Sequence, residues 1–286
     1  MLKRILVTGS GGQLGSQFGL LCPQATTLLL DRQLLDVADA RAVSEAVVTF
    51  APDLVIHTAA MTNVDECESV QGRDLAREIN AAGAKNVARA CSDVGSTMVY
   101  ISTNYVFDGH KSDPYNEDDT TNPLNVYGAT KLQGETAVVN LLEHHYVVRT
   151  STLYGSNTSN FVTSFLGAAS RSQLLNYVND QRVVPTSTAD LAIAIMDLVE
   201  AGTFGIYHLV NEGEATWYCW ARQIMNLAGI RSVTINPISA SEFERPAVIP
   251  RNGVIANNKA MKLGVQLRCW KEALSECMSV IMKGES

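Results

Sequence analysis

The fold is decided by residues 4–15, which read Arg4-Ile5-Leu6-Val7-Thr8-Gly9-Ser10-Gly11-Gly12-Gln13-Leu14-Gly15. A short apolar run typical of a buried strand ends at Thr8, a glycine loop follows at once, and a helix-compatible segment comes next. Strand, glycine loop and helix in this order are the context that a dinucleotide-binding loop requires. Glycines let the backbone approach a pyrophosphate closely, so we interpret the stretch as a nucleotide-binding loop. A glycine-rich hairpin turn is the alternative.

The second strand indicates which dinucleotide could bind. This strand, Thr27–Leu30, ends at Asp31, where a carboxylate can bind the ribose 2′-hydroxyl of NADH. Arg32 follows directly and could bind the 2′-phosphate of NADPH, so both cofactors stay open. The predicted cofactor-binding residues are Gly9, Gly11, Gly12, Gln13, Leu14, Gly15, Asp31, Arg32, Asp36, Val37, Ala59, Ala60, Met61, Tyr127 and Lys131.

Apolar runs and helical segments alternate after this point, which predicts an α/β protein with a Rossmann-type, doubly wound parallel sheet. The expected elements are a helix over 40–50, a strand over 53–57, a helix over 75–93, and strands over 98–101 and 146–149. Residues 58–62 (Thr-Ala-Ala-Met-Thr) follow the 53–57 strand, at the sheet edge where such folds bind ligands.

The later part of the chain is expected to contribute to both of two domains. Residues 1–150 with 176–204 are predicted to form the dinucleotide-binding Rossmann domain, which would include most of a strand over 174–178 and a helix over 188–200. Residues 151–175 with 205–286 are predicted to form a smaller substrate-binding lobe, because the strand and helix pattern loosens after Gly205.

A candidate proton donor follows the 98–101 strand. Tyr127 and Lys131 are four residues apart, which places both side chains on one face of a helix. A nearby ammonium group is expected to lower the pKa of the phenol, and the hydroxyl of Ser102 or Thr103 could hold a substrate oxygen beside it. The alternative is a surface helix with a packed aromatic and a solvated lysine. The convergence of three strand ends on one sheet edge favours carbonyl reduction.

Composition restricts the partners and the compartment. The 286 residues include 46% hydrophobic and 18% charged residues, and the net charge of −7 argues against nucleic acid or an anionic membrane as partner. No run of about 18 apolar residues could span a bilayer, and no signal peptide is expected. Six cysteines without metal-binding spacing suggest free thiols in a reducing cytoplasm, and no metal site is predicted.

Several motifs are shared with one known family. They are residues 59–65 (Ala-Ala-Met-Thr-Asn-Val-Asp), residues 101–109 (Ile-Ser-Thr-Asn-Tyr-Val-Phe-Asp-Gly), Tyr127-Gly128-x-x-Lys131, residues 149–151 (Arg-Thr-Ser) and Arg245-Pro246. In these motifs the chain resembles the dTDP-4-dehydrorhamnose reductases, which are extended short-chain dehydrogenase/reductases. The resemblance covers nearly the whole chain. It implies reduction of the C4 ketone of a nucleotide-linked 4-keto-6-deoxyhexose with NADPH or NADH.

The resemblance also implies roles for individual residues. Tyr127 would be the proton donor, Lys131 its electrostatic partner and a ribose ligand, and Thr103 the hydroxyl that orients the carbonyl. The residues expected to bind substrate are Ser102, Asn104, Tyr105, Phe107, Leu153, Asn160, Trp217 and Arg245. A homodimer is possible.

Three departures from the family pattern are present, one of them Arg182-Val183-Val184 in place of a glycine-containing segment, and the other two leave the sugar open. Asn104 stands where the reductases usually carry Asp, and Leu153 stands where they usually carry Trp. We expect the pair Leu153→Trp and Asn104→Asp to shift substrate preference toward dTDP-4-dehydrorhamnose. The alternative functions are a non-catalytic relative, such as the regulatory subunit of methionine adenosyltransferase, and a nucleotide-sugar epimerase. Dehydration is disfavoured because neither Asn104 nor Tyr105 is a carboxylic acid.

Overall fold

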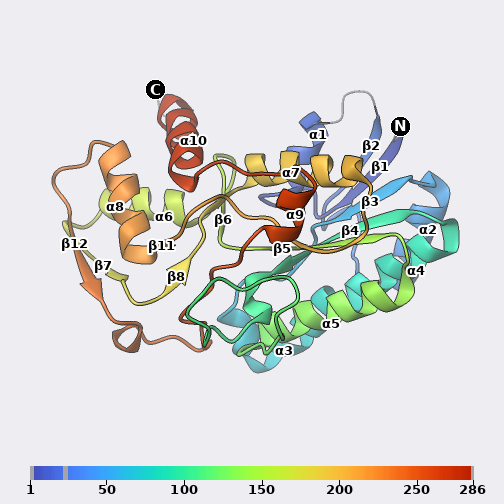
Figure 1. Ribbon diagram of the computed structural model, residues 1–286, viewed down its shortest axis with the longest axis horizontal. Helices are drawn as coiled ribbons and strands as arrows, with labels where there is room; N and C mark the ends of the chain where they lie inside the picture. The colour runs from blue at the N-terminus through green and yellow to red at the C-terminus, as the bar shows by residue number, and fades with distance from the viewer. Residues whose placement is uncertain (1–2, 22–24, 285–286) are drawn as a thin grey trace.

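The computed structural model describes residues 3–21 and 25–284. Six parallel strands form its large sheet, in the order β10-β5-β4-β3-β1-β2 (Figure 1). They are β1 (Arg4–Thr8), β2 (Thr26–Leu30), β3 (Leu54–His57), β4 (Thr97–Thr103), β5 (His145–Thr150) and β10 (Gly205–His208). The chain leaves β1 for β2 on one side and then crosses to β3 on the other. A topological switch point therefore lies between β1 and β3, and the predicted doubly wound fold is confirmed.

Side-chain alternation in β1 builds one apolar core on each face of the sheet. Ile5 and Val7 pack in the core that α7 (Thr188–Ala201) covers, whereas Leu6 packs in the core under the opposite helices. These opposite helices are α2 (Ala40–Phe50), α4 (Ala84–Val94) and α5 (Val126–Leu141). In Figure 1, α4 and α5 lie below the sheet, while α1 (Phe18–Leu21), α7 and α9 (Asn258–Lys262) lie above it.

The helix expected over 75–93 is divided into three parts. α3 (Val70–Ala76) passes into the π-helical turn η3 (Arg77–Gly83), and α4 continues from there. The π-helical turn directs the buried Asn80 into the protein. Its Oδ1 accepts from the Met61 N–H at 2.8 Å, and its Nδ2 donates to the Met61 carbonyl oxygen at 3.1 Å. The side chain thereby holds the loop that follows β3, which the sequence pattern did not reveal.

A second apolar core lies beside the sheet, at the left of Figure 1. It contains the aromatic side chains Tyr154, Phe165, Trp220 and Trp270. The helices around it are α6 (Phe161–Ala169), α8 (Trp217–Leu227) and α10 (Trp270–Gly284). Three two-stranded sheets join this region, namely β7 (Leu174–Val178) with β12 (Thr234–Ile238), β8 (Arg182–Val183) with β11 (Ala215–Thr216), and β6 (Leu153–Tyr154) with β9 (Thr186–Ser187).

Two strands lie elsewhere than the sequence-based division placed them. The sequence pattern predicts β10 in the smaller lobe, but β10 is the edge strand of the large sheet, paired with β5. The sequence pattern predicts most of β7 in the Rossmann domain, but β7 pairs with β12 outside the large sheet. The exposure of β7 is inconsistent with a place in the large sheet. Side-chain exposure alternates along this strand, and Leu174 is exposed. A strand buried on both faces of a parallel sheet would show continuous burial.

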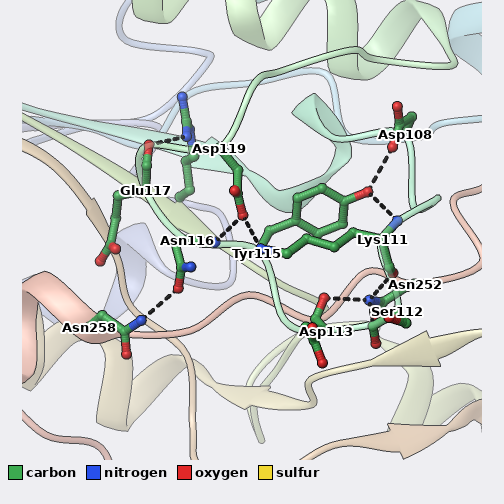
Figure 2. A network of polar contacts seen from close by, with 11 residues as sticks. Asp108, Lys111, Ser112, Asp113, Tyr115, Asn116, Glu117, Asp119, Asn252 and Asn258 are labelled. Carbon is green, nitrogen blue, oxygen red and sulfur yellow. Dashed lines mark hydrogen bonds and ion pairs between the residues drawn. The ribbon is translucent and has the colours of Figure 1, made fainter.

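Residues 250–259, here called the strap, return from the second region to the large sheet. Isolated bridges pair Tyr115 with Ile255 and Arg182 with Asn252. Figure 2 shows the polar contacts that fix the adjoining loop 108–119, where the Tyr115 hydroxyl donates to Asp108 at 2.7 Å. The Lys111 ammonium pairs with Asp119 at 2.6 Å. The strap therefore rests on an ordered loop that follows β4. The short helical turns are η1 (Gly15–Gln17), η2 (Glu66–Glu68), η4 (Asn104–Val106) and η5 (Ala240–Glu242).

Candidate active site

The carboxyl ends of four neighbouring strands surround one cleft of about 370 Å³. The glycine loop follows β1, Thr58 follows β3, Thr103 ends β4 and Thr150 ends β5. A second cleft of about 470 Å³ adjoins the first and shares Gly12, Thr58 and Ala60 with it. The two clefts meet at the switch point between β1 and β3, the position where open α/β sheets bind nucleotides.

Close packing of α5 brings Tyr127 and Lys131 into the first cleft. Asn125 caps the helix by accepting from the Gly128 N–H at 2.8 Å. A Cβ at Gly128 would lie only 2.1 Å from the Tyr105 carbonyl oxygen. The glycine next to Tyr127 therefore lets α5 press against the turn after β4, and this contact places the phenol beside Thr103.

Burial controls the charge state of Tyr127. The phenol is half-buried and lies edge-on to the Tyr105 ring, with 5.9 Å between ring centroids. Burial raises the pKa of Tyr127 well above its ordinary value, and a hydrogen bond with Thr103 opposes this effect. The expected lowering of this pKa is therefore wrong for the protein alone. The phenol keeps its proton at neutral pH, as a proton donor must.

Lys131 lies deeper than its partner. Its side chain is 2% exposed, and Nζ lies 4.1 Å from the centroid of the Tyr100 ring. Burial lowers the pKa of Lys131 from its ordinary 10.5 to about 7, and the Glu135 carboxylate opposes this shift. The amine therefore titrates near neutral pH in the isolated protein, and a negatively charged ligand in the cleft would favour its ammonium form.

The glycine loop fits a dinucleotide. A Cβ at Gly9 would lie 2.6 Å from the Ala59 nitrogen, so the loop can lie against the β3 end only with glycine there. Gln13 Oε1 is buried at the cleft without a hydrogen-bond partner among the described residues. An unpartnered polar atom beside the cradle is the feature that a bound polar ligand would satisfy. The helix after the loop opens as η1 and is short, so the loop backbone, rather than a long helix dipole, would hold the phosphates.

The second cleft gathers the remaining predicted cofactor residues. Its lining includes Gly9, Gly11, Asp31, Arg32, Asp36, Val37, Ala59 and Met61. Asp31 Oδ1 accepts from the N–H groups of Gln33 and Leu34, at 2.8 and 3.0 Å, which orients the carboxylate at the end of β2. The exposed Arg32 stands beside it. The residues predicted for the adenosine end of a cofactor thus come together.

Some residues expected to contact substrate line the first cleft but already have protein partners. Ser102 Oγ donates to Glu135 Oε1 at 2.5 Å, and Glu135 is paired with Arg149 by two hydrogen bonds of 2.9 and 2.7 Å. Asn104 donates to a carbonyl of the strap, described below. Tyr105 and Leu153 line the cleft as expected.

Four residues expected at the substrate site lie outside the cleft lining. Phe107 stacks on Tyr115 in a buried cluster, with 4.4 Å between centroids, and Trp217 stacks with Trp220 at 5.8 Å. Asn160 caps α6 and uses its amide on backbone groups. Arg245 forms two hydrogen bonds with Asp65, at 3.0 and 2.9 Å. These four residues are absent from the site that we propose.

The residues selected from the sequence as site residues leave out others that line the first cleft. They are Thr58, Thr62, Val64, Ile101, Thr150, Ser151 and Thr152. Thr150 Oγ1 is buried there and has no partner among the described residues. The rule that selected Thr103, a hydroxyl at the carboxyl end of a parallel strand, also applies to Thr58 and Thr150 and could have found both.

Comparison with known proteins identifies the family. Residues 3–282 match the family described as the RmlD substrate binding domain. A dTDP-4-dehydrorhamnose reductase from Streptomyces griseus is 39% identical over 282 residues, covering 96% of this chain and 92% of the relative. The chain belongs to the dTDP-4-dehydrorhamnose reductase family. The family predicted from the sequence motifs is thereby confirmed.

Two further relatives of this reductase family bear on substrate and cofactor. A dTDP-4-keto-6-deoxy-D-glucose reductase from Streptomyces niveus is 34% identical over 290 residues, which span the full length of both chains. The crystal structure of a dTDP-4-dehydrorhamnose reductase from Bacillus anthracis, in complex with NADP, superposes with a TM-score of 0.94. It is 36% identical and covers 98% of this chain and 100% of that one. No helix in the described part of the chain is long and apolar enough to cross a membrane.

Proposed function

We propose that the protein reduces the C4 ketone of a dTDP-linked 4-keto-6-deoxyhexose with NADPH or NADH. The observation that carries the proposal is the meeting of Thr103, Tyr127 and Lys131 in one cleft that adjoins the glycine loop. The relatives' names and the NADP complex of the Bacillus anthracis enzyme support the substrate class and the cofactor. A non-catalytic binding subunit would not require these three residues together.

The cofactor would lie along both clefts. The glycine loop would hold the pyrophosphate, Asp31 and Arg32 would flank the adenosine ribose, and Lys131 would bind the nicotinamide ribose. When bound, the cofactor supplies a hydride to the sugar C4. The net charge of −7 makes a nucleic-acid partner unfavourable, and we place the reaction in the cytoplasm.

The protein's residues would manage the proton and the carbonyl. The Thr103 hydroxyl would bind the C4 carbonyl oxygen and hold it beside the Tyr127 phenol. Tyr127, kept neutral by burial, would donate its proton to that oxygen as negative charge develops. Lys131 would stabilise the resulting phenolate, and charge on the phenolate would in turn favour the ammonium form of Lys131.

Tyr127→Phe tests this assignment. The variant lacks the donated proton but keeps the ring, so we expect kcat to fall by about 10²–10⁴-fold while dinucleotide affinity changes little. The assay follows NADPH or NADH absorbance with a panel of dTDP-, GDP- and UDP-linked 4-keto-6-deoxy sugars. Turnover within a few-fold of the unmodified protein would show that Tyr127 is not the acid. An unmodified protein that reduces none of the sugars would refute the proposed function.

A further inference from the structure

Hydrogen bonds join Thr103 to the strap. Its hydroxyl donates to Asn104 Oδ1 at 3.3 Å, and Asn104 Nδ2 donates to the Gly253 carbonyl oxygen at 2.8 Å. The Tyr105 N–H donates to Thr103 Oγ1 at 3.2 Å. Thr103 and Asn104 are 6% and 3% exposed, so water does not compete strongly for these groups.

The Gly253 carbonyl determines which way the Asn104 amide points. A carbonyl oxygen can only accept, so the NH₂ end of the amide must face it. The amide oxygen then faces Thr103, where it accepts the hydroxyl hydrogen. A carboxylate in the place of Asn104 would set an oxygen against the carbonyl oxygen and lose this anchor. Asn104 is therefore matched to the strap of this chain.

The Asn104 amide can approach the backbone at Gly253 this closely because residue 253 has no side chain. A Cβ there would lie 2.6 Å from Asn104 Nδ2 and 3.1 Å from the Arg182 carbonyl oxygen. Gly253 has no positive φ, so the glycine is required by space and not by backbone conformation. Gly253 does not line the active-site cleft. Any effect of this residue on catalysis must therefore pass through a neighbour such as Asn104.

We propose that Asn104 is a positioning residue, which holds the Thr103 hydroxyl beside Tyr127 through its anchor on Gly253. The inference rests on the proposed reductase function. Both ends of the amide are engaged, so Asn104 orients the hydroxyl and does not select the sugar. The 3.3 Å bond is long for an O–H donor. The hydroxyl hydrogen can therefore turn to a substrate oxygen at little cost while Oγ1 stays in place.

Kinetics of Asn104→Ala and Gly253→Ala test the proposal. We expect each to lower kcat by about 10- to 100-fold, because a displaced hydroxyl disturbs the reacting geometry. KM for the keto sugar should change by less than about 3-fold, since neither Asn104 nor Gly253 contacts the sugar in this proposal and only the position of the Thr103 hydroxyl changes. In the Asn104→Ala background, Gly253→Ala should cost little more, because the added methyl group no longer meets the amide. The proposal would be overturned if the fold-losses of kcat in the two single variants multiplied in the double variant. A change in KM alone would also overturn it.

Asn252→Ala is the matched control. The Asn252 amide is also buried and donates to the carbonyl oxygens of Lys111 and Asp113, at 2.8 and 3.0 Å (Figure 2). Its Oδ1 accepts from the Val254 N–H at 3.1 Å, so it anchors the strap beside Gly253 without a hydrogen bond to Asn104 or Thr103. Asn252→Ala should lower the unfolding temperature and leave kcat within about 3-fold. An equal loss of kcat in Asn252→Ala and Asn104→Ala would mean that strap anchoring in general, and not Asn104, matters.

Stability measurements separate this inference from the proposed function. The unfolding free energies of the two single variants and the double variant at positions 104 and 253 form a double-mutant cycle, which needs no substrate. Non-additive losses would support the Asn104–Gly253 anchor even if the unmodified protein reduced none of the sugars. Additive losses would remove the anchor even if the reductase activity were established.

Discussion

Replacing Lys131 by Met should make the cofactor-free protein more stable while it abolishes catalysis. Lys131 is 2% exposed, and burial lowers its pKa from 10.5 to about 7. This difference corresponds to a folding cost of at most about 5 kcal/mol for the lysine below pH 7. Met fills a similar volume without a charge, so the variant should recover part of that cost.

The stability gap is the difference in unfolding free energy between Lys131→Met and the unmodified protein. Its direction of change with pH tests the reasoning. Between pH 7 and 10.5 the unfolded chain binds the Lys131 proton and the folded protein does not. The stability of the unmodified protein should therefore rise with pH in this window relative to the variant. The advantage of Lys131→Met should be largest near pH 6.5 and about 2–3 kcal/mol smaller at pH 9.

Urea unfolding of both proteins at pH 6.5, 7.5 and 9 measures the gap. Other titrating groups are common to both proteins, so they cancel in the difference. Lys259→Met is the control, because this lysine lies at the surface and pairs with the exposed Asp118. Its gap should not change with pH. The reasoning is refuted if the Lys131→Met gap is also constant with pH, or if that variant is less stable at pH 6.5.

Two further predictions concern the clefts. Gly12→Val should abolish dinucleotide binding, because residue 12 lines both clefts and even a Cβ there would lie 3.2 Å from the Gly9 carbonyl oxygen. Unchanged dinucleotide affinity in a fluorescence titration would contradict the assignment of the glycine loop. Leu153→Trp adds a broad aromatic face to the first cleft, where we place the sugar. It should change the kcat/KM ratio between dTDP-4-dehydrorhamnose and dTDP-4-keto-6-deoxyglucose by about 5-fold, the equivalent of about 1 kcal/mol, and an unchanged ratio would show that the sugar does not reach residue 153.

The sequence predicted what local patterns encode. The α2 bounds of Ala40–Phe50 and the glycine loop after β1 follow from periodicity and spacing over a few residues. The strand-end rule also placed Thr103 at the correct sheet edge, because parallel strands share their carboxyl ends. Tyr127 and Lys131 could be predicted for the same reason, since four residues of helix fix their relative direction.

Long-range partners could not be predicted in this way. Arg245 pairs with Asp65 across 180 residues, and Asn104 meets a carbonyl 149 residues away. A polar side chain with a free amide or guanidinium group looks the same in sequence whether it binds substrate or the protein itself. The strand β7 was misplaced because the residues that pair with it, in β12, follow much later in the chain.

The number of residues in the π-helical turn over Arg77–Gly83 determines where the Asn80 side chain points. Each residue of an α-helix advances the side-chain direction by about 100°. Deleting one residue would let the i→i+5 hydrogen bonds of the turn close into the i→i+4 bonds of ordinary α-helix, but it would change the side-chain directions within the turn and carry Asn80 away from Met61. Substitutions at the exposed Arg77 or Glu78 preserve the register. Insertions and deletions here should thus be far more damaging than replacements.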